Sequence, residues 1–218
     1  MSKNNMLDGA QVIVDYLIQQ KVPYAFGLCG HGNIQFIDAL FERQSEIKTI
    51  STHHESVCGF MADVYYRVKG EPVATFTSCG PGSVNLPISL ATAYLDAVPF
   101  LAVTGNVPTG QFNRNAFQES GKFHQADFPS VVRPYVKRSF QPTRVDMLPL
   151  ALKQAFGLMR SGRPGPVLID FPKDLQVEAA SGETNYDPPM NLPGYRPEPK
   201  PVNPAQIRQV LAAIKRSR

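Results

Sequence analysis

Short apolar segments without polar alternation constrain the fold of this chain more than any other feature. Residues 73–77 read Val-Ala-Thr-Phe-Thr, residues 99–104 read Pro-Phe-Leu-Ala-Val-Thr, and each segment is followed by a glycine turn. Strands that are apolar on both faces are typical of parallel sheets covered by helices. The sequence therefore predicts an α/β fold with a doubly wound, mostly parallel sheet of about six strands and helices on both faces. The predicted strands are residues 24–27, 47–51, 73–77, 99–104, 136–140 and 167–171.

Helical periodicity fills the segments between these strands. The predicted helices include residues 34–41, 54–69, 84–96 and 147–160, and an amphipathic helix at 204–215. Residues 184–203 are rich in proline and lack apolar periodicity, which is the composition of a semi-rigid linker. We therefore expect a main domain at residues 1–183, a linker at 184–203 and the start of a second domain at 204–218.

Glycines and histidines gather at the carboxyl ends of the predicted strands, where open α/β sheets bind ligands. These ends include residues 27–33, 52–55 and 77–83. Glu55 stands near a helix N-terminus, where the helix dipole favours the ionised carboxylate and an apolar pocket would favour the protonated one. Such opposed effects can prepare a carboxylate for proton transfer. Position alone favours a purely structural first-turn residue over a chemical one.

Three other kinds of site have weaker support. The glycines at residues 27–32 and 80–82 follow strands, but the chain lacks a Gly-x-Gly-x-x-Gly fingerprint and a Walker lysine. The histidines and cysteines lack zinc-ligand spacing, so no metal site is predicted. Cys79 near a helix N-terminus could have a lowered pKa, yet no motif supplies it with a base. A plain nucleotide-binding α/β protein remains an alternative.

Composition excludes several classes of partner. The formal net charge is +4, without the basic stripe of a nucleic-acid-binding protein. No apolar run approaches the roughly 18 residues of a membrane span. Three widely spaced cysteines argue against a disulfide framework. We expect a cytoplasmic protein that binds neither nucleic acid nor membranes.

Longer segments carry a more specific signal than the separate residues. Residues 94–108 read Tyr-Leu-Asp-Ala-Val-Pro-Phe-Leu-Ala-Val-Thr-Gly-Asn-Val-Pro, residues 116–119 read Ala-Phe-Gln-Glu, and residues 162–167 read Gly-Arg-Pro-Gly-Pro-Val. Together with Glu55 and the Gly-Pro-Gly turn, they resemble the thiamine diphosphate-dependent enzymes of the acetolactate synthase, pyruvate decarboxylase and benzoylformate decarboxylase type. The resemblance runs from about Asp8 to the C-terminus.

The resemblance implies that residues 1–183 form a domain that binds the pyrimidine half of thiamine diphosphate (PYR domain), and that residues 204–218 begin a truncated central domain. Glu55 would be catalytic: its hydrogen bond to the pyrimidine ring would activate the aminopyrimidine and lead to the thiazolium ylid that attacks a 2-keto acid. The cofactor-binding residues implied are Glu55, Gly80, Pro81, Gly82 and Asn85.

A second group of residues would line the substrate side of this pocket. It consists of His31, Gly32, Phe117 and Gln118, with His54 and His124 as further candidates. His31 departs from the family pattern, which commonly has a small or polar residue at this point. This departure leaves open which 2-keto acid or acyloin is the substrate, but not which cofactor is used.

The family binds the cofactor's diphosphate through Mg²⁺ on a later domain, and its Gly-Asp-Gly motif does not occur here. Mg²⁺ would come from a domain outside this chain, so the chain alone is expected to be inactive. The resemblance leaves open whether FAD also binds. It implies a homodimer, with a homotetramer as the alternative. A non-catalytic or complementing subunit of a split enzyme is the rival interpretation.

Overall fold

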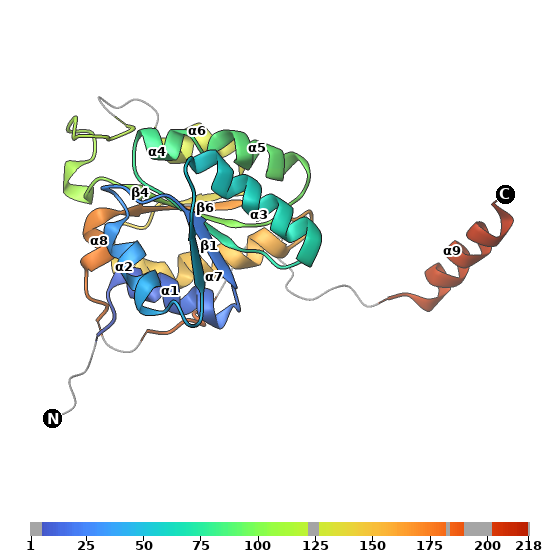
Figure 1. Cartoon of the computed structure of the whole chain (residues 1–218). Helices are drawn as coiled ribbons and strands as arrows, with labels where there is room; N and C mark the ends of the chain where they lie inside the picture. Colours follow the sequence, from blue (N-terminus) through green and yellow to red (C-terminus); the bar gives the residue numbers. More distant parts are fainter. Residues whose placement is uncertain (1–5, 122–126, 182–183, 190–201, 218) are drawn as a thin grey trace.

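A parallel sheet forms the centre of the molecule (Figure 1). It has six strands in the order β2-β1-β3-β4-β6-β5, and all neighbouring strands are parallel. The computed structural model describes residues 6–121, 127–181, 184–189 and 202–217. The strands are β1 Tyr24–Gly27, β2 Lys48–Ser51, β3 Ala74–Thr77, β4 Leu101–Asn106, β5 Ser139–Phe140 and β6 Val167–Pro172. The central strands β3 and β6 are buried along their whole length. The predicted parallel sheet is confirmed.

Helices cover both faces of this sheet (Figure 1). One apolar cluster joins β1, β3, β4 and β6 to α1 Gly9–Gln19, α2 Ile34–Glu42, α7 Leu148–Arg160 and α8 Lys173–Val177. A second cluster, on the other face, joins the sheet to α3 Glu55–Lys69, α5 Pro87–Leu95 and α6 Phe128–Val132. Two separate cores on opposite faces confirm the doubly wound architecture.

Three predicted boundaries differ from the structure. The single helix expected at residues 84–96 is two helices, α4 Pro81–Val84 and α5. The break precedes Pro87, which has no N–H for a continuous helix but fits the first turn of a new one. The fourth strand lies two residues later than expected, and only Ser139–Phe140 of residues 136–140 pair with β6.

The strand order places a switch point between β1 and β3. The chain proceeds from β1 to β2 on one side, and then returns to β3 on the other side of β1. Crossovers therefore leave this point in opposite directions, which opens a crevice at the carboxyl ends of the two strands. The loops at residues 28–33 and 78–80 meet there.

The C-terminal region contains α9 Pro204–Arg216, whose described side chains are all exposed, including the apolar ones. Residues 190–201 of the predicted linker lie outside the described residues. Before them, Tyr186 packs against Tyr16 of α1, with ring centroids 5.9 Å apart. Within the described ranges, no helix has both the length and the apolar character needed to cross a bilayer.

Candidate functional site

The loops after β1 and β3 lie so close together that only glycine fits at the points of contact. Gly32 N donates to Ser78 Oγ at 3.0 Å. A Cβ on Gly30 would lie 2.4 Å from Ser78 Cβ, and one on Gly32 would lie 2.9 Å from Cys79 Sγ. Real side chains do not tolerate such distances, so both glycines are needed for the two loops to approach. We call residues 30–32 and 78–82 the glycine-lined site.

Glu55 lies beside this site as the first residue of α3. Its Oε2 accepts a hydrogen bond from Asn85 Nδ2 at 2.9 Å. Its Oε1 lies 3.2 Å from the position of a Cβ on Gly82. Within the described residues, no hydrogen bond to Oε1 is seen. One carboxylate oxygen is thus held by the protein, while the other faces the glycine turn.

His54 precedes Glu55 and fixes the start of α3. Its Nδ1 accepts a hydrogen bond from Ser56 N at 3.3 Å and lies 2.8 Å from Ser56 Oγ. The imidazole therefore serves as the helix cap, a role that serine, aspartate or asparagine more often has. His54 positions Glu55 through the backbone, and among the described residues its ring has no hydrogen bond to the glycine-lined site.

Gly80 allows Gln118 to approach the glycine-lined site. Its backbone has φ 58° and ψ −120°, and a Cβ there would lie 2.5 Å from Gln118 O. Cys79 Sγ donates to Gln118 Oε1 at 3.7 Å. Phe117, in contrast, is 77% exposed. Of the substrate-side residues predicted from sequence, Gly32 and Gln118 are therefore in contact with the turn after β3, whereas Phe117 faces solvent.

His31 is exposed, and its Nε2 lies 3.2 Å from Lys173 Nζ at the start of α8. His124 lies outside the described residues. In the ranges that the structure describes, no three histidine, cysteine or acidic side chains gather to hold a metal ion. Burial raises the pKa of the Cys79 thiol despite the nearby Ser78 hydroxyl, which works against a thiolate nucleophile.

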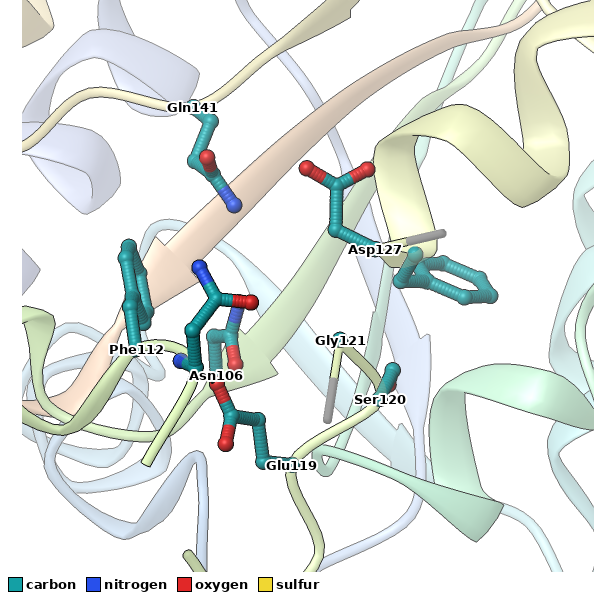
Figure 2. Close-up of a pocket in the computed structure, with 9 residues that line it drawn as sticks. Asn106, Phe112, Glu119, Ser120, Gly121, Asp127 and Gln141 are labelled. Carbon is teal, nitrogen blue, oxygen red and sulfur yellow. Dashed lines mark hydrogen bonds between the residues drawn. The ribbon is translucent and has the colours of Figure 1, made fainter. Parts of the chain in front are cut away.

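A polar pocket of about 250 Å³ opens beyond the end of β4 (Figure 2). Asn106 and Gln141 line it, and both donate to the fully buried Asp170, at 2.6 and 2.7 Å. Thr104 Oγ1 adds a third hydrogen bond at 3.2 Å. Burial nevertheless raises the pKa of Asp170 to about 6. This carboxylate fixes the side-chain amides that line the pocket.

Several of these residues were not predicted from sequence. The sequence does contain a signal for Ser78, because this small hydroxyl residue directly follows a buried strand. Lys173 and Gln176 carry none: both stand on the short helix after β6, where Gln176 Nε2 donates to Gly32 O at 2.7 Å. Asp170 sits inside a strand that the sequence shows only as buried.

The chain is similar to a known protein family and to several curated proteins. The family model described as "Thiamine pyrophosphate enzyme, N-terminal TPP binding domain" matches residues 7–127. Acetolactate synthase 3, chloroplastic, of Brassica napus is 37% identical over 211 residues, which are 96% of this chain and 31% of that protein. Acetolactate synthase of Arthrospira platensis is 38% identical over 94% of this chain and 35% of that protein. The acetolactate synthase large subunit of Corynebacterium glutamicum is 35% identical over 96% and 31%. The chain spans about a third of the length of these relatives.

Proposed function

Because this chain belongs to the thiamine pyrophosphate enzyme family, we propose that it is the N-terminal, pyrimidine-binding domain of an acetolactate synthase-like decarboxylase or carboligase. The relatives named above are acetolactate synthases. The substrate would be a 2-keto acid or an acyloin. The observation that carries the proposal is that the two carboxylate oxygens of Glu55 have different surroundings: Asn85 donates to Oε2, whereas Oε1 faces Gly82.

Glu55 Oε2 is held by Asn85, which fixes the orientation of the carboxylate. Oε1 faces Gly82 and is free to share a proton with a ring nitrogen of the pyrimidine. The carboxylate stands in the first turn of the 15-residue helix α3. Asn85 would keep the carboxylate in place while the proton moves.

The glycine-lined site fits a flat aromatic ring. Gly80 and Gly82 present backbone rather than side chains, and a Cβ on Gly82 would intrude between the turn and Glu55 Oε1. A ring could therefore lie directly against this turn. Thiamine diphosphate, when bound, supplies the carbon nucleophile for attack on a 2-keto acid. The protein would supply position and one proton acceptor.

Residues outside this chain would hold the diphosphate and Mg²⁺. The described residues contain no acidic or histidine cluster for a metal ion. We therefore propose that the 218-residue chain binds the full cofactor weakly and is inactive by itself. The rival interpretation, a complementing subunit of a split enzyme, makes the same prediction for the isolated chain and stays open.

An exposed apolar face supports the proposal of a homodimer. Val57, Phe60, Val64 and Val68 follow one another at helical spacing along α3 and are all exposed, Val68 by 72%. Ile88 of the adjacent helix α5 is 62% exposed. Contiguous exposed apolar surface of this kind marks interaction sites. A second copy seated on this α3–α5 face would lie next to Glu55, the first residue of α3.

Binding of thiamine tests the proposal on the chain itself, because thiamine lacks the diphosphate. We expect thiamine to shift the amide resonances of Gly80 and Gly82 and the side-chain amide of Asn85 in a ¹⁵N-labelled chain. Glu55→Gln should weaken binding by about tenfold, because a carboxylate hydrogen bond is worth more than an amide one. Glu71→Gln, at an exposed carboxylate beyond the other end of α3, is the matched control.

Two outcomes would overturn the proposal. One is that thiamine leaves the resonances of Gly80 and Gly82 unmoved, and the other is that Glu55→Gln binds thiamine as tightly as the parent chain. Adenosine monophosphate serves as the comparison ligand. If it shifts these glycines and thiamine does not, the plain nucleotide-binding alternative replaces the thiamine one.

A further inference from the structure

His31 and Lys173 form a pair that the proposed function does not use. Lys173 Nζ lies 3.2 Å from His31 Nε2, within hydrogen-bonding distance. An ammonium group can only donate, so Nε2 of the imidazole must accept. A neutral imidazole that accepts at Nε2 carries its proton on Nδ1. The contact therefore favours the Nδ1–H tautomer of His31.

The position of Lys173 is fixed by the short helix α8 on which it stands. Asp174, the next residue, accepts from Thr109 N at 3.0 Å and from Thr109 Oγ1 at 2.6 Å. Gln176 is fully buried and donates to Gly32 O, the residue after His31. These bonds tie α8 to the loops after β4 and β1. Lys173 is therefore held against His31 by its neighbours.

Lys173 has no competing carboxylate in the described residues. None of the ion pairs among the described residues includes Lys173. The carboxylate of the adjacent Asp174 already accepts a hydrogen bond from Thr109. The charge of Lys173 acts at the glycine-lined site, because it lowers the pKa of Cys79. Burial has a larger effect and raises that pKa. Cys79 in turn borders Gly32. The pair thus adjoins the site rather than a remote surface.

We propose that Lys173 is a positioning residue that holds His31 in its Nδ1–H tautomer, so that His31 offers a hydrogen-bond donor to an oxygen atom of the substrate. The inference rests on the proposed function, because the oxygen belongs to a 2-keto acid at the glycine-lined site. Without Lys173, the ring could present either nitrogen as the acceptor. With Lys173, Nε2 is occupied and only Nδ1–H is available.

Long-range ¹H–¹⁵N spectra of the full chain test the tautomer directly, without cofactor or activity. The chain has four histidines, so loss of one signal set in His31→Gln assigns the ring. At about pH 9, well above the usual histidine pKa of about 6.5, we expect the parent chain to show protonated Nδ1 and unprotonated Nε2. In Lys173→Met the ratio of tautomers should shift about tenfold or more toward Nε2–H, the effect of losing one hydrogen bond to a charged group.

Methionine keeps much of the length and apolar character of the lysine stem, so Lys173→Met removes mainly the charge. Lys173→Arg retains a charged donor and should retain the Nδ1–H tautomer. The exposed ring of His53 should keep its tautomer in all variants. An Nε2–H ring at His31 in the parent chain, or an unchanged tautomer in Lys173→Met, would overturn the inference.

Pyruvate is the probe for the substrate half of the inference. It should shift the Nδ1 and Hδ1 signals of His31 in the parent chain, and should do so several-fold less in Lys173→Met. If pyruvate leaves His31 unmoved while thiamine still shifts Gly82, the inference fails and the proposed function stands. If thiamine fails as well, both fall.

Discussion

The buried carboxylate of Asp170 makes stability depend on pH in an unusual direction. Desolvation raises its pKa from the usual 3.8 to about 6, although Gln141, Asn106 and Thr104 donate to it. That rise corresponds to about 3 kcal/mol, because each pKa unit is worth about 1.4 kcal/mol. The folded chain therefore binds this proton more tightly than the unfolded chain does.

It follows that the contribution of Asp170 to stability is fully present below about pH 3.8 and is lost as the pH rises through about 6. Most native carboxylates act in the opposite sense, because folding lowers their pKa. Asp170→Asn removes the titration and retains the side-chain shape. We expect the free energy of unfolding of the parent chain, minus that of Asp170→Asn, to fall by about 2 kcal/mol between about pH 4 and pH 7, because part of the contribution is already lost at pH 4.

Urea unfolding followed by circular dichroism measures this difference, since the chain has no tryptophan. Asp38→Asn, at an exposed carboxylate on α2, is the control and should show no such fall. A difference between parent and Asp170→Asn that is flat with pH, or that rises with pH, would refute the argument. It would mean that the hydrogen bonds to Asp170 outweigh its desolvation.

Three further predictions concern the turn after β3, the α3–α5 face and the thiols. Gly80→Ala should lower the free energy of unfolding by about 2–3 kcal/mol, from strain and overlap together, whereas Gly70→Ala, at φ 72° with open space around it, should cost about 1 kcal/mol in urea melts. Val64→Glu should convert the proposed homodimer to a monomer in analytical ultracentrifugation. Val177→Glu, at an equally exposed valine on α8, should not. A parent chain that is monomeric at all concentrations contradicts the proposed homodimer. Cys29 is the exposed thiol, so Cys29→Ser should remove the fast phase of reaction with a thiol reagent, and a persisting fast phase would show that a buried thiol is reached.

The fold was predictable because its signals are local and repeated. Each buried strand is a run of apolar residues, and each crossover helix has its own period, so the layers follow without knowledge of any contact. The position of Glu55 at a strand end was predictable for the same reason. Its significance was not, because a carboxylate in the first turn of a helix is common in structural roles. The resemblance of residues 94–108 to a family, rather than the carboxylate itself, indicated its chemistry.

The residues that were missed depend on contacts between distant parts of the chain. Lys173 is separated from His31 by 142 positions, and Asp170 from Asn106 by 64. No local pattern records such pairs. They arise because β4 and β6 are neighbours in the sheet and α8 leaves β6 beside the loop after β1.

The break between α4 and α5 shows how a local signal and a distant contact combine. Pro87 ends the first helix early, so Asn85 becomes its C-cap rather than an interior helical residue. At a cap the side chain is free to turn toward the start of α3, where its amide reaches Glu55 Oε2. A continuous helix through residues 84–96 would have carried Asn85 on a regular helical face. The same proline that made the predicted helix wrong therefore places the amide that orients the proposed catalytic carboxylate.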